Sequence, residues 1–453
     1  MINKKPIIFT PLDNVQKSVI TTSFNNNIVS VCGAAGTGKT TVIINLALNY
    51  ILQNKKVLIC SKSDNATDVI YNRLLKFNDY AVIRAGNKAL LSNKIENILE
   101  KKINVDFVKK GLFERLQPIE QLQNAINTRL LVCMESKEIR QSLLTYKNSM
   151  YWTDGKAVCD KHFATILELL PCWCVNSLKI AEAIPLQQDL FDVAIIDEAS
   201  QCDIASSLPV LYRAKKAVVI GDNKQLKHIS FLAKNKEKSF FKKNNVQPDE
   251  QLVWRYRTNS LYDWALYYAD KQIMLKNQYR MPEKLFDFSN KHFYNNSIQT
   301  ICQKMGSIEK IKVDGIKDEQ KSRNKYEVKE IINWIQNNKE KNKTLAIISP
   351  FAEQVKFIQK SFDKTFSFEQ MNNITISTIY GMQGNEADIV LISWVISDNN
   401  ARALQTYIEK PNVFNVGITR AKEKLVNFYS FNNIPKGLLS EYLETVEIGK
   451  IGV

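Results

Sequence analysis

The sequence predicts an α/β protein with two tandem domains, each built around a parallel sheet. Three observations lead to this prediction: the length of the chain, the alternation of short apolar runs with helical patterns, and the polar residues that follow several of those runs. At 453 residues the chain exceeds the size of a single core, since cores stop growing at about 250 to 300 residues. We expect a first domain over residues 1–272 and a second over residues 273–453.

The first domain contains short apolar runs that are typical of buried strands in a doubly wound sheet. These runs are Ile28–Cys32, Val57–Cys60, Phe191–Ile196 and Ala217–Ile220. Two of them precede helical patterns, Thr40–Leu52 and Asn65–Leu75, which gives the strand–helix order of parallel sheets. Polar side chains at the carboxyl ends of such strands lie where ligands bind.

Two stretches of the first domain differ from this pattern. Residues 88–170 carry apolar side chains at helical spacing among many charges, as at Leu122, Ile126 and Leu130, and we expect a helical insertion there. The lysine-rich stretch Lys234–Lys243 predicts a solvated loop, with contact to phosphate as the alternative.

After Pro282 a second α/β pattern begins. Its predicted strands are Thr344–Ile348, Ile374–Thr378 and Ile389–Val395, and its predicted helices are Glu327–Asn337 and Phe351–Phe362.

The charge balance favours a polyanionic partner. Lys and Arg number 62 against 46 Asp and Glu, for a formal charge of +16, and basic side chains gain by displacing counterions from phosphate backbones. A lysine-rich proteome would give the same surplus, so the charge alone leaves both explanations open. We find no apolar stretch of the length that a membrane span needs and no leader-like apolar core in the first nine residues, so we expect neither membrane association nor export.

The eight scattered cysteines favour a reducing intracellular compartment, which we take to be the cytoplasm. Cys159, His162, Cys172 and Cys174 lie close together in sequence, but their spacing is not that of a zinc site. We therefore expect no metal at these four residues.

A glycine-rich segment indicates a phosphate-binding loop. Residues Gly33 to Thr40 read G-x-x-x-x-G-K-T, with a predicted strand before and a predicted helix after. Glycines let backbone N–H groups approach phosphate oxygens, Lys39 reaches the β- and γ-phosphates, and Thr40 would hold Mg²⁺. The residues expected to bind the nucleoside triphosphate are Gly33, Ala34, Gly36, Thr37, Gly38, Lys39, Thr40 and Thr41.

Hydrolysis of the triphosphate also needs carboxylates at the end of another strand. The apolar run Phe191–Ile196 ends in Asp197 and Glu198. Asp197 would organise the Mg²⁺ shell, and Glu198 would orient and deprotonate the attacking water.

From Asp197-Glu198-Ala199-Ser200 onward the sequence resembles the superfamily 1 helicases. Later segments are similar to the motifs of that family in the same order: Gly221–Leu226, Asn277–Pro282, Thr378–Glu386 and Val416–Lys422. The Tyr-Arg-Met form of the second segment resembles the group, of superfamily 1B type, that contains the nonsense-mediated-decay helicase and senataxin. The resemblance implies two tandem RecA-like P-loop domains, with the helical insertion at the place of an accessory subdomain in the first.

The resemblance also implies roles at the nucleotide. Gln16, in a segment similar to the adenine-reading Gln motif, would read the adenine edge, and Tyr279 would stack on the base. Glu386 would contact the ribose.

Three further residues would act in catalysis alongside Lys39 and the acidic pair. Gln225 would couple the γ-phosphate to the domain interface. Arg280 and Arg420 would be arginine fingers contributed by the second domain.

Contacts to nucleic acid rest on weaker signatures, because they depend on backbone phosphates and stacking. The residues expected to make them are Ser63, Asn65, Asn176, Thr378 and Tyr380. Asp64 departs from the family, which usually has Asn there, and Asn176 stands about where Thr is common. Tyr380 replaces a usual polar residue and could either stack on a base or pack internally.

The resemblance implies an ATP-dependent helicase or translocase. Hydrolysis of Mg-ATP at the interface of the two domains would drive 5′→3′ movement on single-stranded DNA or RNA. The alternative is a nucleic-acid-stimulated ATPase that acts as a non-unwinding clamp or switch and recruits or gates a partner protein. Because the chain starts just before the Gln motif and stops soon after the last motif, we expect any nuclease or targeting module on a separate partner.

Overall fold

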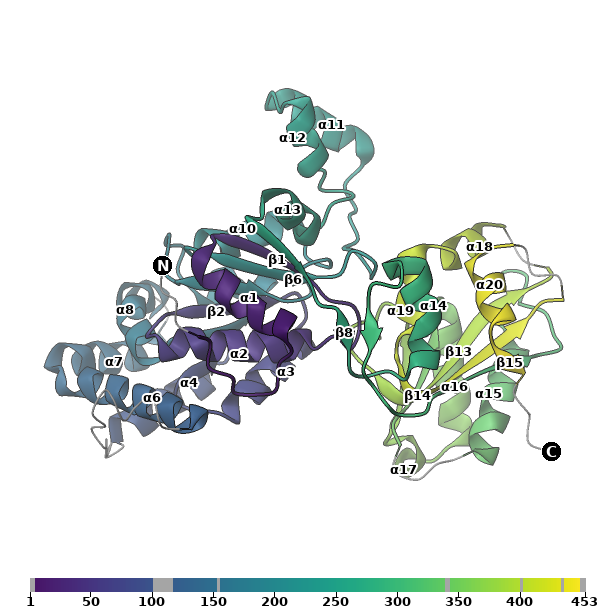
Figure 1. Cartoon of the computed structure of the whole chain (residues 1–453), viewed down its shortest axis with the longest axis horizontal. Helices are drawn as coiled ribbons and strands as arrows, with labels where there is room; N and C mark the ends of the chain where they lie inside the picture. Colours follow the sequence, from purple (N-terminus) through teal and green to yellow (C-terminus); the bar gives the residue numbers. More distant parts are fainter. Residues whose placement is uncertain are drawn as a thin grey trace. The chain divides into compact units, whose positions relative to one another are not determined.

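The computed structural model describes residues 5–100, 117–152, 155–338, 343–399, 402–432 and 436–448. Its contacts divide the chain into two compact units, each an α/β unit with its own parallel sheet (Figure 1). The first unit comprises residues 1–33, 38–222 and 227–275. The second comprises residues 34–37, 223–226 and 276–453.

The sheet of the first unit has seven parallel strands in the order β3-β4-β2-β5-β6-β1-β7. Their bounds are β1 Ile28–Cys32, β2 Val57–Ser61, β3 Val82–Arg84, β4 Cys172–Asn176, β5 Val193–Ile196, β6 Ala217–Gly221 and β7 Lys271–Met274. The predicted strands of this unit are confirmed. Strands β3, β4 and β7 were not among the predicted runs, and of these β3 and β7 lie at the two edges of the sheet and are short and only partly apolar.

Helices surround this sheet, and their apolar faces form a core with its strands. Those of the strand–helix units are α1 Asn14–Asn25, α2 Lys39–Leu52, α3 Asp64–Leu75, α9 Ile180–Ala183, α10 Ile204–Tyr212 and α13 Leu261–Tyr268. The helices predicted over residues 88–170 are confirmed in the described part, as α4 Lys88–Glu100, α6 Pro118–Glu135, α7 Lys137–Ser149 and α8 Gly155–Leu169. Leu122, Ile126 and Leu130 of α6 are buried, as their spacing predicted. Residues 101–116 and 153–154 of the predicted insertion lie outside the described residues.

The loop predicted over Lys234–Lys243 is wrong. These residues form helix α11, followed by the short helix α12 (Pro248–Val253). The stretch forms a helix despite its charge because lysine and glutamate are good helix formers. The Glu237 carboxylate accepts a hydrogen bond from the Arg257 N–H at 2.9 Å.

The second unit has a sheet of six parallel strands in the order β12-β11-β13-β14-β10-β15. Their bounds are β10 Ser307–Lys312, β11 Leu345–Ser349, β12 Ile374–Thr378, β13 Ala387–Ser397, β14 Ala421–Ser430 and β15 Glu447–Ile448, and a separate ladder pairs β8 Asn277–Gln278 with β9 Gln299–Thr300. The helices are α14 Glu283–Tyr294, α15 Lys325–Asn337, α16 Ala352–Thr365, α17 Phe368–Met371, α18 Arg402–Ile408, α19 Pro411–Ile418 and α20 Leu438–Glu444. The predicted strands and helices are confirmed, while β10 and β14, whose lysines and glutamates interrupt the apolar pattern, were missed.

A buried carboxylate ties α15 to this sheet. Glu327 has no exposed surface, and its oxygens accept hydrogen bonds from the Ser393 hydroxyl at 2.6 Å, the Val395 N–H at 2.9 Å and the Ser430 hydroxyl at 2.9 Å. Burial raises the pKa of Glu327 to about 7, against these hydrogen bonds, which lower it. In the described part of the chain no helix is long and apolar enough to cross a membrane.

Candidate functional site

The candidate residues of the first unit follow neighbouring strands and leave the sheet at one edge. The register pairs residues at the ends of neighbouring strands: Cys32 with Gly221, Cys60 with Ile196, and Ser61 with Asn176. These strands therefore end at the same level. The glycine-rich loop follows β1, the acidic pair follows β5, and polar candidates follow β2 and β4. Because all these strands are parallel, that level is their carboxyl edge, where α/β sheets bind ligands.

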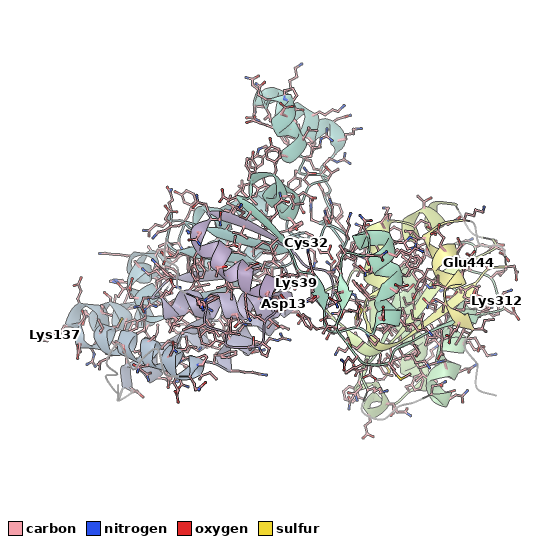
Figure 2. The ribbon with its side chains drawn as sticks, viewed as in Figure 1. Asp13, Cys32, Lys39, Lys137, Lys312 and Glu444 are labelled. Carbon is pink, nitrogen blue, oxygen red and sulfur yellow. The ribbon has the colours of Figure 1, made fainter. Side chains whose placement is uncertain are left out.

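The glycine-rich loop joins β1 to α2, as Figure 2 shows by its labels on Cys32 and Lys39. Gly36 and Gly38 have φ angles of +79° and +82°, in the left-handed region that favours glycine. The Gly33 N–H donates to the Gly221 carbonyl at 3.0 Å, and Lys39 Nζ donates to the Gly33 carbonyl at 2.8 Å. The lysine therefore already lies over the loop whose N–H groups would bind phosphate.

The other residues predicted for the loop line its interior or begin α2. Ala34 and Thr37 are buried, and the Thr37 hydroxyl donates to the Ala34 carbonyl at 2.8 Å. Thr40 and Thr41 are partly exposed in the first turn of α2, whose N-terminus adds a positive end to the loop.

Gln16 lies beside this loop. A Cβ atom added to Gly38 would be 2.6 Å from Gln16 Nε2, so the glycine leaves room for the amide. Gln16 Oε1 accepts a hydrogen bond from the Asp13 N–H at 3.0 Å, and Asp13 Oδ1 accepts one from the Gln16 N–H at 2.8 Å, which caps α1. Adenine reading by Gln16 stays a prediction, and the oxygen of its amide serves the helix cap in this structure.

The acidic pair follows β5 directly. Asp197 is buried, and its N–H donates to the Cys60 carbonyl at 2.8 Å. Burial and the neighbouring Glu198 raise the pKa of Asp197 to about 7, against the opposing effect of Lys39.

Glu198 has a left-handed backbone with φ of +51°, which is uncommon for a residue other than glycine and clusters at functional sites. Its N–H donates to Asp197 Oδ1 at 2.9 Å, and its Oε2 accepts from Gln201 Nε2 at 3.1 Å. Gln201 was not predicted, although it lies only three residues beyond Glu198.

The predicted Mg²⁺ ligands fit that ion chemically. The Thr40 hydroxyl and the Asp197 carboxylate are oxygen donors, and a buried carboxylate beside a second one is where a divalent cation relieves the most repulsion. Among the described residues no cluster of three or more His, Cys, Asp or Glu could hold a metal ion. Magnesium commonly takes only one or two carboxylates together with substrate phosphates.

In the second unit Arg280 and Glu386 form an ion pair. Arg280 Nη1 donates to Glu386 Oε2 at 2.5 Å, Arg280 Nη2 donates to the Thr419 carbonyl at 3.0 Å, and Lys422 Nζ lies 3.2 Å from Glu386 Oε1. Burial alone would raise the pKa of Glu386, but Arg280 and Lys422 hold it below its ordinary value. Glu386, which was predicted to contact the ribose, is therefore paired with Arg280, a predicted arginine finger. It is also paired with Lys422, to which no role was assigned.

The remaining nucleotide candidates differ in exposure. Arg420 is 2% exposed, and its guanidinium donates to the Val416 carbonyl at 2.9 Å and to the Thr419 hydroxyl at 3.0 Å. Tyr279 is 41% exposed, and Gln225 is buried.

The nucleic-acid candidates of the first unit surround an ion-pair cluster that was not predicted. Asp64 accepts from Arg84 Nη2 at 2.7 Å and from Lys179 Nζ at 3.0 Å, which lowers its pKa. The departure of Asp64 from the family type is therefore accompanied by two compensating cations. Ser63 caps α3, with its Oγ accepting from the Ala66 N–H at 3.0 Å.

Two more of these candidates differ in their exposure. Asn176 is buried and accepts from the Leu178 N–H at 3.0 Å, whereas Asn65 is exposed. Asn65 is therefore better placed than Asn176 to reach a ligand in solvent.

Thr378 and Tyr380 lie at the carboxyl edge of the second sheet. Thr378 pairs with Ser349 at the ends of β12 and β11, and its Oγ1 accepts from the Gly381 N–H at 3.0 Å. Glu386 and Arg420 instead precede the paired starts of β13 and β14, at the amino edge. The second unit thus separates its predicted nucleic-acid residues from its predicted nucleotide residues by the length of the strands.

These features define a P-loop protein with two α/β units of RecA-like type. An AAA-domain family model matches residues 11–168 and 171–230, and a second AAA-domain model matches residues 257–428. The chain belongs to the superfamily 1 helicases, in the group that includes the nonsense-mediated-decay helicase and senataxin.

Curated relatives agree with this assignment. The chain is 24% identical to an uncharacterized ATP-dependent helicase of Methanocaldococcus jannaschii, with 91% of the chain and 66% of the relative covered. It is 24% identical to the DNA polymerase alpha-associated DNA helicase A of Saccharomyces cerevisiae (94% and 65% covered) and 23% identical to human probable helicase senataxin (90% and 18% covered). The chain therefore spans less than two thirds of the length of each of these relatives. Among solved structures, an arterivirus nonstructural protein 10 helicase aligns with 92% of the chain at 11% identity and a TM-score of 0.42.

Proposed function

We propose that this chain is an ATP-dependent helicase or translocase, in which hydrolysis of Mg-ATP drives movement along single-stranded DNA or RNA. One observation carries the proposal: Lys39 and the Asp197–Glu198 pair leave the same edge of one parallel sheet, directly after β1 and β5. A lysine-bearing phosphate loop beside two carboxylates, one of them buried, is the minimum set for cleavage of a phosphoanhydride bond.

The proposed chemistry begins with the triphosphate in the glycine-rich loop. Lys39 exchanges the Gly33 carbonyl for phosphate oxygens, and the N–H groups of the loop bind the remaining charge. Glu198 takes the proton of the attacking water, and the Gln201 amide 3.1 Å away orients its carboxylate. Thr40 and Asp197 would hold Mg²⁺, which when bound neutralises charge on the phosphates.

The second domain is proposed to supply further residues that contact the nucleotide, so that hydrolysis depends on whether this domain engages it. Arg280 and Arg420 stabilise the charge that develops on the transferred phosphoryl group, a contribution of about 10³ to 10⁵ in rate in analogous enzymes. Glu386 takes the ribose and Tyr279 takes the base, while Gln225 couples the γ-phosphate to the second domain. Since Arg280 is ion-paired with Glu386 in this structure, engaging the nucleotide requires both groups to change partners.

The direction of movement is proposed from the resemblance to the group. We propose 5′→3′ movement, strand contacts from Ser63, Asn65, Asn176, Thr378 and Tyr380, and a separate partner protein for any nuclease or targeting role. A clamp that hydrolyses ATP on nucleic acid without unwinding would use the same residues.

The test measures ATP hydrolysis and strand displacement together. Unmodified protein is assayed with and without single-stranded RNA and DNA, and on duplexes with either a 5′ or a 3′ tail. We expect stimulation by single strands and displacement from the 5′ tail only. Stimulated hydrolysis without displacement would replace the helicase with the clamp, and no stimulation by any polynucleotide would contradict both.

Two substitutions test the residue roles. Lys39→Ala should abolish ATP binding, and Glu198→Gln should keep ATP binding but reduce turnover by about 10² or more, as loss of a general base does. Lys76→Ala, at an exposed lysine at the end of α3, is the matched control. Hydrolysis at the unmodified rate by Glu198→Gln would show that another group activates the water.

A further inference from the structure

A helical arm follows directly on the Gly221–Leu226 motif. The arm, residues 229–258, carries α11 and α12, and Figure 1 shows these two helices projecting away from the sheet of the first unit, beyond α13. None of the residues of α11 is buried. The core of the unit therefore does not need this helix.

The arm is nevertheless held firmly at its base. Lys227 Nζ lies 3.0 Å from Asp263 Oδ1, and His228 Nε2 lies 2.6 Å from the Tyr256 carbonyl oxygen. The Asn259 amide donates to the carbonyl of Leu252 at 2.6 Å. These contacts hold the two ends of the arm together, so the arm is a defined structural element.

The outer surface of α11 is strongly basic. Its five lysines are Lys234, Lys236, Lys238, Lys242 and Lys243, all exposed, and within the described part of the chain none of them takes part in an ion pair. Lys234, Lys238 and Lys242 follow one another at a spacing of four, which places like charges side by side and destabilises a free helix. A polyanion would remove this repulsion.

Aromatic side chains lie among these lysines. Lys236, Phe240 and Lys243 have the i, i+4, i+7 spacing of one helix face, and Phe240 is 53% exposed between the two cations. Phe231, at the start of the arm, is 96% exposed. Exposed aromatic rings beside cations are how proteins bind single strands without sequence preference, since bases stack on the rings while the cations bind phosphates.

We propose that the α11 surface is a second binding site for single-stranded nucleic acid, separate from the sheet edges. This inference rests on the proposed function and deepens it, because it assigns part of the affinity for the strand to the arm. The arm follows the motif that contains Gln225, so a strand held on α11 would also act on a segment that is proposed to take part in catalysis.

The test compares the salt dependence of binding between two triple variants. The arm variant is Lys236→Gln, Lys238→Gln and Lys243→Gln, and the control removes the same charge from exposed lysines of α16, as Lys356→Gln, Lys360→Gln and Lys364→Gln. Affinity for labelled oligo(dT) and oligo(U) is measured over a range of salt. We expect the slope of log K against log[salt] to decrease by about 2 in the arm variant, for three lost phosphate contacts, and to be unchanged in the control.

A second pair of variants tests the stacking. Phe240→Leu should weaken single-strand binding at least about fivefold, the lower end of the effect of losing one stacked base, while Phe368→Leu at the exposed phenylalanine of α17 should not. Thermal unfolding of each variant verifies that it folds.

The outcomes separate this inference from the proposed function. If unmodified protein binds no single strand, both fail. If it binds but the arm variants behave like their controls, or lose only duplex binding, the site on α11 is refuted and the proposed function stands. An arm that captures an acidic protein instead would give this second result.

Discussion

Glu327→Gln should change how the stability of the second unit depends on pH. In the folded chain the pKa of Glu327 is about 7, whereas in the unfolded chain it has its ordinary value of 4.5. Between these values the folded state holds a proton that the unfolded state has lost, so the stabilisation is complete below pH 4.5 and is lost as pH rises to 7. From pH 5 to pH 8 this linkage removes roughly 2 to 3 kcal/mol of stability from the unmodified protein.

Glutamine has the same shape and cannot ionise, so the variant should lack this loss. Its amide oxygen can still accept from Ser393 and Val395, which keeps two of the hydrogen bonds. Relative to unmodified protein, Glu327→Gln should gain about 2 to 3 kcal/mol of unfolding free energy between pH 5 and pH 8.

Urea unfolding at a series of pH values measures this difference, and hydrogen exchange of peptides from β13 and β14 localises it. Glu330→Gln, one turn along α15 and only partly buried, is the control and should keep the unmodified pH dependence. If the stability curves of Glu327→Gln and unmodified protein run parallel from pH 5 to pH 8, the carboxylate is ionised in the folded state and the reasoning from burial is wrong.

Three other substitutions test the candidate sites. Arg280→Lys keeps the charge but not the planar fork, so turnover of ATP should fall by about 10³ while ATP affinity changes little, and single-turnover rates within twofold of normal would exclude a finger role. Gly38→Ala should abolish ATP binding, because its φ of +82° and a side-chain amide nitrogen 2.6 Å away both oppose a methyl group. Gly86→Ala has a similar φ of +90° but open space, so calorimetry should find normal ATP affinity; equal losses would mean that strain alone is responsible. Asp64→Asn should strengthen single-strand binding several-fold and steepen its salt slope by about 0.7, as one more cation becomes available, whereas Asp68→Asn should do less, and weaker binding by the Asp64 variant would contradict this account.

Local patterns in the sequence predicted the central strands and the chemistry attached to them. The run Ile28–Cys32 is buried between β6 and β7, and such apolar runs report their own burial. The phosphate loop and the acidic pair are recognisable because each needs its residues at fixed short spacing. The edge strand β3 and the charged strand β14 carry no such pattern, and α11 was mistaken for a loop because charge says little about helix formation.

The contacts that define the partners of the site residues could not be predicted. Arg280 and Glu386 are separated by 106 positions, and Asp64 and Lys179 by 115, so their pairing depends on the complete fold. The same holds for Glu327, which reads as a solvated helix residue in the sequence and is buried because β13 and β14 cover it. The tertiary structure determines which charged residues pair with each other, whereas the sequence pattern indicates only the helix or strand in which each one lies.

The segment from Thr378 to Glu386 is a short mechanical link across the second sheet. It starts at the carboxyl edge and ends at the amino edge, and Ile379 and Met382 anchor it in the core. Its turns are closed by backbone hydrogen bonds, from the Met382 N–H to the Thr378 carbonyl at 3.0 Å and from the Asn385 N–H to the Met382 carbonyl at 3.0 Å. A segment closed by these turns has little slack, so we expect a displacement of Glu386 to reach Thr378 through the covalent chain between them.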